Sequence, residues 1–229
     1  MRQIETDEAA LRTFASRIEH TLLRPDATPF DVERLCAEAT EWTFATVCIN
    51  SAFAKLASES VRGTGVGVTA TIAFPFGASN TAAKLSEGQQ AIADGATELD
   101  MVIEIGWLRA GLDGLVRDEI AAMRSATEGK TLKVILETAL LTDAEMIRGA
   151  RLASEAGADF VKTSTGFARS GATADDVHLL RQAVPWRVRI KAAGGIRSYA
   201  QARALIEAGA DRLGTSHGVQ LIEEVAAHH

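Results

Sequence analysis

The chain has 229 residues and a formal net charge of −6, and 47% of its residues are hydrophobic, which is ordinary for a globular protein. It contains no run of Lys and Arg that would bind nucleic acid, no stretch of the ~20 apolar residues that a membrane span needs, and no apolar signal-peptide core in Met1–Ala15. Only Cys36 and Cys48 occur, and the five histidines form no ligand-like cluster, so neither a disulfide framework nor a metal site is indicated and a cytoplasmic protein is expected.

The sequence predicts a helix over Met1–Arg17, followed by strands that alternate with helices. A Gly-Ala step recurs at Gly95, Gly157 and Gly209, each time between a helical pattern and an apolar run. Glycine fits the left-handed position just past a helix C-terminus, so each step indicates a helix end, a tight turn and a strand start. The predicted strands, in chain order, are Ile18–Leu22, Thr46–Asn50, Val66–Phe74, Glu98–Ile105, Leu132–Glu137, Asp159–Thr163, Val188–Lys191 and Arg212–Gly214.

Amphipathic segments lie between these strands, and Thr142 followed by Glu145 has the spacing of a helix capping box. Strands that alternate with helices favour a parallel sheet covered by helices. Eight such units in a chain of this length favour a closed barrel over an open sheet. We therefore predict an α/β fold, a single (β/α)8 TIM-barrel domain over residues 1–229 with an extra N-terminal helix. The predicted helices between strands include Asp31–Thr40, Thr81–Asp94, Gly114–Ser125, Asp143–Ala156, Ala174–Ala183 and Tyr199–Ala208.

Charged residues occur at the positions of these strands that should face the barrel interior. Side chains alternate along a strand, so residues of one parity share one face of the sheet. In Glu98–Ile105 the apolar residues take the parity that faces the helices, which leaves Asp100 and Glu104 pointing inward. The same rule, applied to four strands, predicts that Asp100, Lys133, Glu137, Lys162 and Lys191 surround one lumen.

Two of these residues, Lys162 and Lys191, lie at the C-terminal ends of neighbouring predicted strands, where barrel enzymes keep their active sites. Two lysines in a partly desolvated cleft lower each other's pKa, and a neutral amine is the nucleophile that a carbonyl substrate needs. A structural ion network is the alternative interpretation. Because burying charged groups is costly even when they are paired, the pattern favours catalysis.

Gly-rich loops follow the last two predicted strands and contain Gly194, Gly195, Gly214 and Ser216. Barrels often bind phosphate with backbone N–H groups of these two loops and the N-terminus of a short helix. We therefore predict a phosphate site there, to which Arg197 could add charge. Beyond Lys162, the hydroxyl and amide groups of Thr165 and Gly166 are candidates for contacts with substrate oxygens.

Four segments carry a resemblance to a known family, and they occur in order and at barrel spacing. They are Glu98–Val102, Leu132–Thr138, Phe160–Phe167 and Lys191–Arg197. In these segments the chain resembles the deoxyribose-phosphate aldolases, and the resemblance extends over nearly the whole sequence.

The resemblance implies a class I aldolase that reversibly cleaves 2-deoxy-D-ribose 5-phosphate into D-glyceraldehyde 3-phosphate and acetaldehyde, in deoxyribonucleoside catabolism. It implies that Lys162 forms the Schiff base, that Lys191 activates it, and that Asp100 relays protons through water, with Lys133 as a supporting polar residue. It also implies sugar-phosphate and aldehyde partners and no cofactor. A homo-oligomer, a dimer, is expected.

Three residues depart from the usual pattern of the family. Glu19 stands where Asp is usual, Glu104 where Asn or an uncharged residue is usual, and His217 where a second Ser is usual. The last departure leaves the details of phosphate recognition open. Two alternative functions also remain: another sugar-phosphate barrel enzyme, transaldolase-like or an isomerase, and a catalytically silent sugar-phosphate binding barrel.

Overall fold

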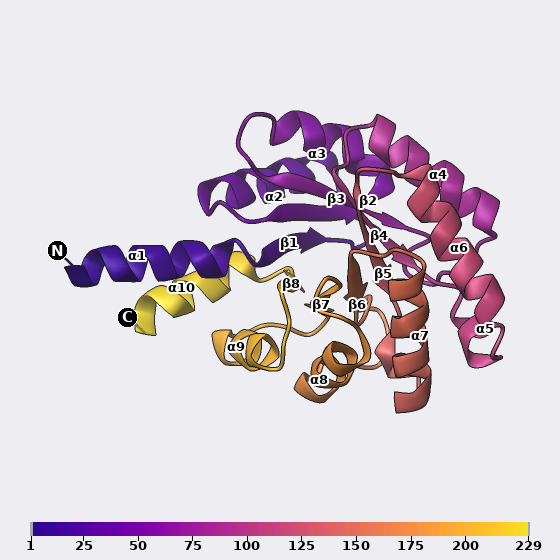
Figure 1. Cartoon of the computed structure of the whole chain (residues 1–229). Helices are drawn as coiled ribbons and strands as arrows, with labels where there is room; N and C mark the ends of the chain where they lie inside the picture. Colours follow the sequence, from indigo (N-terminus) through magenta and orange to yellow (C-terminus); the bar gives the residue numbers. More distant parts are fainter. Residues whose placement is uncertain (1, 229) are drawn as a thin grey trace.

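Eight parallel strands form the centre of the molecule and close into a barrel, in which each strand pairs with the next and β8 pairs with β1 (Figure 1). The computed structural model describes the backbone of residues 2–228 and the side chains of residues 8–227. The predicted closed barrel is confirmed. Its strands are β1 Ile18–Leu22, β2 Thr46–Asn50, β3 Gly67–Ile72, β4 Glu98–Val102, β5 Thr131–Ile135, β6 Phe160–Lys162, β7 Arg189–Ala193 and β8 Arg212–Thr215.

Helices surround the barrel, and the predicted N-terminal helix is α1, which lies beside the last helix, α10 (Figure 1). Three helices were absent from the sequence prediction: α3 Ala54–Ser60, α5 Ile105–Arg109 and α10 Gly218–His228. None of the helices over residues 2–228 is long and apolar enough to cross a membrane. The remaining helices are α1 Arg2–Ala15, α2 Pro29–Glu41, α4 Thr81–Ala93, α6 Asp113–Ala126, α7 Asp143–Glu155, α8 Ala174–Ala183 and α9 Tyr199–Glu207, with short 3-10 turns η1 Ser51–Phe53 and η2 Thr138–Leu140.

Local sequence signals set many of the element boundaries. The capping box predicted at the start of α7 is present: the Thr142 side chain accepts from the backbone N–H of Glu145, whose carboxylate accepts from the backbone N–H of Thr142. The three Gly-Ala steps also behave as predicted, because Gly95, Gly157 and Gly209 take φ values of 101°, 89° and 114°. These left-handed turns return the chain from a helix to the start of the next strand.

The apolar core lies between the barrel and its helices, whereas the barrel interior holds charges. Leu99 and Met101 of β4 and Val134 of β5 are fully buried on the outer side, in the shared apolar core. The alternate residues Asp100 and Lys133 are also fully buried, but they point inward and contact one another. The alternation of the strands therefore separates a conventional core from a charged lumen.

Two inward placements predicted from alternation are wrong, because the strands end earlier than the apolar pattern does. Strand β4 ends at Val102, and Glu104 instead caps α5 by accepting a hydrogen bond from the Gly106 N–H at 3.2 Å. Strand β5 ends at Ile135, and Glu137 lies past it with left-handed backbone angles of φ 59° and ψ 70°. Beyond the end of a strand the pleat no longer decides where a side chain points.

A buried ion pair outside the barrel connects two helices to the end of β4. Lys84 Nζ on α4 lies 2.9 Å from Glu119 Oε1 on α6, and it donates to the carbonyl of Val102 at 3.0 Å. The side chains of Lys84 and Glu119 are 0% and 1% exposed, so neither charge reaches bulk water when its partner is removed.

We predict that Glu119→Ala lowers the free energy of unfolding by about 3–5 kcal/mol, because Lys84 becomes an unpaired buried charge. Urea denaturation followed by circular dichroism measures this loss. The double variant Lys84→Met, Glu119→Leu is the control and should lose less stability, since it removes both charges and keeps the volume. A Glu119→Ala protein within about 1 kcal/mol of wild type would contradict the prediction.

Candidate active site

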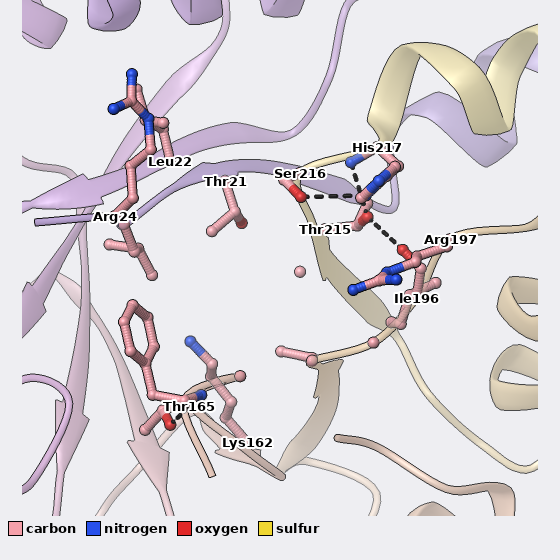
Figure 2. Close-up of a pocket in the computed structure, with 17 residues that line it drawn as sticks. Thr21, Leu22, Arg24, Lys162, Thr165, Ile196, Arg197, Thr215, Ser216 and His217 are labelled. Atoms are coloured by element: carbon pink, nitrogen blue, oxygen red, sulfur yellow. Dashed lines mark hydrogen bonds between the residues drawn. The ribbon is translucent and has the colours of Figure 1, made fainter. Parts of the chain in front are cut away.

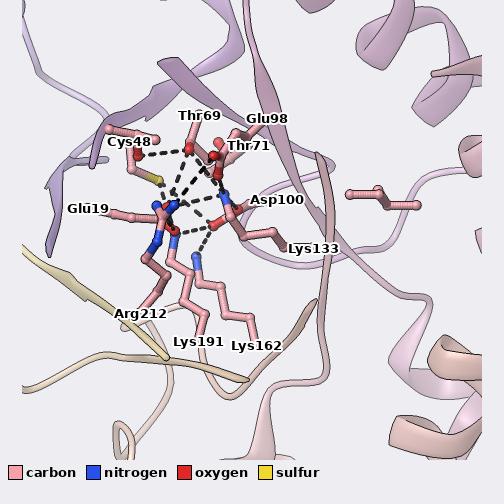
Figure 3. Close-up of polar contacts among 12 residues, drawn as sticks. Glu19, Cys48, Thr69, Thr71, Glu98, Asp100, Lys133, Lys162, Lys191 and Arg212 are labelled. Atoms are coloured by element: carbon pink, nitrogen blue, oxygen red, sulfur yellow. Dashed lines mark hydrogen bonds and ion pairs between the residues drawn. The ribbon is translucent and has the colours of Figure 1, made fainter. Parts of the chain in front are cut away.

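Three lysine ammonium groups converge on the carboxylate of Asp100 inside the barrel (Figure 3). The Nζ atoms of Lys162 and Lys191 lie 2.6 and 2.7 Å from Asp100 Oδ2. Lys133 Nζ lies 2.9 Å from the other oxygen, Oδ1. Asp100 is fully buried, so these contacts lie in the protein interior. Charge–charge interactions are stronger there than in bulk water.

A second carboxylate, Glu19, completes this group. It contacts the Lys191 ammonium, and its Oε2 lies 3.2 Å from Lys133 Nζ. We call Glu19, Asp100, Lys133, Lys162 and Lys191 the lysine–carboxylate cluster. From the sequence, Glu19 stood out only as a departure from a family pattern, although the alternation of Ile18–Leu22 places it inward with Thr21.

Strand register brings the cluster together. Lys162 and Lys191 are direct register partners on β6 and β7, and Asp100 and Lys133 are direct partners on β4 and β5. Glu19 on β1 can reach Lys191 only because the barrel closes between β1 and β8. Alternation therefore selects which residues face inward, while closure brings residues far apart in sequence into contact.

The cluster shifts the pKa values of its members. Burial by itself raises the pKa of Asp100, but the ammonium groups of Lys133, Lys162 and Lys191 outweigh it and hold this pKa well below its usual range. Burial also raises the pKa of Glu19, but the ammonium groups of Lys133 and Lys191 outweigh it and lower this pKa to about 2. Both carboxylates are therefore ionised at neutral pH.

For Lys191 the shift is opposite to the one expected from a pair of lysines. Burial lowers the pKa of this ammonium group, but Asp100, Cys48 and Glu19 raise it above the ordinary value. The carboxylates thus outweigh any lowering of the Lys191 pKa by a neighbouring lysine. Two buried carboxylates, Asp100 and Glu19, contact its ammonium group, so Lys191 stays protonated at neutral pH.

A cavity of about 320 Å³ opens at the C-terminal ends of the strands, and of the three cluster lysines it is Lys162 that lines it. Figure 2 shows the Lys162 side chain directed into this main cavity. Lys191 and Lys133 lie deeper, each with 0% exposure. The lining residues are Thr21, Leu22, Leu23, Arg24, Lys162, Thr165, Gly166, Phe167, Ala193, Gly194, Gly195, Ile196, Arg197, Gly214, Thr215, Ser216 and His217.

All the predicted substrate and phosphate residues lie on this cavity. Thr165 and Gly166 follow β6, Gly194 and Gly195 follow β7, and Gly214 and Ser216 lie at the end of β8. Gly214 allows a close approach, since an added Cβ would lie 3.0 Å from both Ala193 Cβ and Lys191 Cε. The backbone of β8 can therefore lie directly against a cluster lysine.

Two cationic side chains and a histidine border the same cavity. Arg197, a candidate from its sequence position, is joined by Arg24 from the loop after β1, which no sequence motif indicated (Figure 2). His217 also lines it, with Nδ1 3.1 Å from the hydroxyl oxygen of Ser216. His20 is separate: it is buried in packing, and its Nε2 lies 2.7 Å from Glu38.

A metal ion would meet competition within the cluster. Among the described side chains, one group of three potential ligands has the required proximity, namely Glu19, Cys48 and Asp100. The two carboxylates of this group already contact the ammonium groups of Lys162 and Lys191. A cation bound there would face these like charges, so the donor set suits ammonium groups better than a metal.

A family model described as DeoC/LacD family aldolase matches residues 13–221. The chain belongs to this family. The aldolase is 49% identical to the deoxyribose-phosphate aldolase of Coprothermobacter proteolyticus over 208 residues, which are 91% of the chain and 95% of the relative. It is also 49% identical to that of Carboxydothermus hydrogenoformans, over 91% of the chain and 93% of the relative. A solved deoxyribose phosphate aldolase from Aeropyrum pernix, described as a unique tetramer, matches with a TM-score of 0.86 and 34% identity, covering 100% of the chain and 99% of that structure.

Membership in this family confirms the resemblance inferred from the four sequence segments and makes the protein an enzyme of the lyase class. The isomerase and silent-barrel alternatives are not favoured, because the family and these relatives are aldolases. The aldolase thus has a lysine at the edge of a cavity, beside an ionised carboxylate, at the end of the barrel where such enzymes carry out their chemistry.

We predict that Glu19 stabilises the fold only where its carboxylate is ionised. Its pKa is about 2 in the folded protein against an ordinary 4.5, so its contribution is full above about pH 4.5 and is lost as the pH falls toward 2. Glu19→Gln should therefore be less stable than wild type near pH 6, by on the order of 3 kcal/mol, and the difference should shrink at pH 4 and again at pH 3. Urea denaturation at the three pH values tests this, and a constant difference would contradict it.

Proposed function

We propose that this aldolase cleaves 2-deoxy-D-ribose 5-phosphate reversibly into D-glyceraldehyde 3-phosphate and acetaldehyde, with Lys162 as the Schiff-base nucleophile. The observation that carries the proposal is that Lys162 alone among the three cluster lysines lines the main cavity, 2.6 Å from an ionised carboxylate. The names of the relatives support this substrate, since each is called a deoxyribose-phosphate aldolase.

In the cleavage direction the Lys162 amine attacks the C1 aldehyde of the open-chain sugar, and loss of water leaves an imine. The C3 hydroxyl then loses its proton, the C2–C3 bond breaks, and its electron pair is delocalised into an enamine instead of a bare carbanion. D-Glyceraldehyde 3-phosphate leaves at this point. Protonation of the enamine at C2 and hydrolysis of the imine release acetaldehyde and restore the lysine.

Asp100 and Lys191 have different parts in this scheme. Asp100 contacts Lys162 directly and is ionised, so it can accept and return protons through a water molecule. Lys191 stays protonated and shares Oδ2 of Asp100 with Lys162, so its charge repels a second ammonium there and favours attack by a neutral amine. Lys133 supports the arrangement by holding the other oxygen of Asp100.

The phosphate is proposed to bind at the end of the cavity formed by the loops after β7 and β8. Gly194, Gly195, Gly214 and Ser216 border that end, and the guanidinium group of Arg197 adds positive charge. His217, in place of the usual second Ser, lies beside Ser216 and would contact the same group. Binding energy from the phosphate helps to position the distant reacting carbon over Lys162.

We further propose that the enzyme is cytoplasmic, acts in deoxyribonucleoside catabolism, uses no cofactor, and functions through one barrel domain in a homo-oligomer, expected to be a dimer. The relative from Aeropyrum pernix is described as a tetramer, so sedimentation analysis should distinguish the two assemblies for this chain.

Covalent trapping tests the nucleophile. Incubation with acetaldehyde and borohydride should add one two-carbon unit to Lys162 and inactivate the enzyme, because reduction fixes the imine. Peptide mass spectrometry locates the label, and Lys162→Arg is the unlabelled control. A label elsewhere, or activity abolished by EDTA, would overturn the assignment, and an active enzyme that never traps acetaldehyde would favour a transaldolase-like function.

The Asp100→Asn variant tests the proton relay. This change keeps the shape of the side chain and removes its basicity, so kcat should fall by ~10²-fold or more, while borohydride still traps the imine. Glu98→Gln is the matched control: the ion pairs of Glu98 are with Lys133, at 2.6 Å, and with Arg212, so this variant should retain far more of kcat. If Asp100→Asn turns over at nearly the wild-type rate, Asp100 is only a counter-ion.

A further inference from the structure

Glu137 is held in an unfavourable state next to the main cavity. Its backbone is left-handed, at φ 59° and ψ 70°, a region that residues other than glycine rarely adopt. Its side chain is only 3% exposed, and Oε1 is buried without a hydrogen-bond partner among the described residues. Glu137 is the buried carboxylate that combines an unsatisfied oxygen with left-handed backbone angles, and strain of this kind is typical of functional sites.

The other oxygen of Glu137, Oε2, holds Thr165 in place through two hydrogen bonds. Glu137 Oε2 accepts hydrogen bonds from the Thr165 hydroxyl and from the Thr165 backbone N–H, the latter at 3.2 Å. Thr165 lines the main cavity together with Lys162, as Figure 2 shows, whereas Glu137 does not line it. Glu137 lines a neighbouring cavity of about 280 Å³ that shares Thr165 and Phe167 with the main cavity, and its hydrogen bonds to Thr165 connect it to the substrate site.

The hydrogen bond to Glu137 fixes the direction in which the Thr165 hydroxyl group donates its proton. A hydroxyl has one proton to donate and two lone pairs. The proton is given to Glu137, and one lone pair accepts the backbone N–H of Phe167 at 3.1 Å. One lone pair remains, so Thr165 can accept a hydrogen bond from a substrate group but has no proton left to donate.

The chemistry of the proposed substrate identifies the group that fits. Between C1, bound to Lys162, and the phosphate at C5, the sugar carries hydroxyls at C3 and C4. The C3 hydroxyl loses its proton during cleavage and becomes the product carbonyl, so it cannot remain a donor. The C4 hydroxyl keeps its proton throughout, and it becomes the hydroxyl next to the carbonyl in glyceraldehyde 3-phosphate.

We propose that Glu137 is a positioning residue that fixes the Thr165 hydroxyl as a hydrogen-bond acceptor, and that the site thereby selects aldehydes with a hydroxyl next to the carbonyl. The inference rests on the proposed aldolase function and adds a specificity determinant to it. An aldehyde that lacks this hydroxyl offers no donor to the Thr165 oxygen, and the lost hydrogen bond costs transition-state binding.

The test compares two acceptor aldehydes in the synthetic direction, with acetaldehyde as donor: D-glyceraldehyde 3-phosphate, and 3-oxopropyl phosphate, which is the same molecule without the hydroxyl. The wild-type kcat/KM should favour the hydroxylated aldehyde tenfold or more. Glu137→Ala and Thr165→Val should each reduce this ratio to within about threefold of unity. Glu137→Gln, which keeps an acceptor oxygen, and Thr165→Ser, which keeps the hydroxyl, should retain most of the preference.

A double variant separates positioning from a general loss of structure. If Glu137 acts through Thr165, adding Glu137→Ala to Thr165→Val should leave the preference ratio unchanged. The inference is overturned if the wild-type enzyme shows no preference, if Glu137→Ala slows both aldehydes equally, or if the two substitutions lower the ratio independently. A wild-type protein that condenses acetaldehyde with neither aldehyde would instead overturn the proposed function itself.

Discussion

Asp100 accepts contacts from three lysine ammonium groups inside a closed barrel, and the rest of the site depends on this arrangement. An isolated buried carboxylate would gain a proton, and isolated buried lysines would lose theirs. The neighbouring ammonium groups keep Asp100 ionised, so the lumen holds a base beside a lysine that reaches the cavity. The apolar layer outside the strands supplies the rigidity that keeps the distances fixed.

Depth within the barrel gives otherwise similar lysines different roles. Lys133 and Lys191 are surrounded by carboxylates, which raise the pKa of each above its ordinary value. Lys162 has a single carboxylate partner among the described residues and lines the cavity that a substrate can enter. The same residue type thus serves as fixed charge or as candidate nucleophile according to its neighbours.

Substrate selection, in the scheme proposed above, is divided between two regions of one cavity. The glycine-rich ends of β7 and β8 offer backbone and positive charge to a phosphate. The loop after β6 offers a hydroxyl whose orientation is set from behind by a strained carboxylate, Glu137. Neither region contains the cluster that performs the proposed chemistry, so specificity could change in this fold without disturbing Asp100 or Lys162.

The sequence by itself determined the barrel and most of the charged lumen, because alternation along a strand and capping at a helix end are local properties. Asp100, Lys133, Lys162 and Lys191 were therefore placed correctly. Only the tertiary structure decided the contribution of Glu19, which needs barrel closure, and the positions of Glu104 and Glu137, which lie past strand ends that the apolar pattern does not mark. It also decided the charge of Lys191, because a pKa depends on the distances to groups that are remote in sequence and adjacent only in the folded barrel.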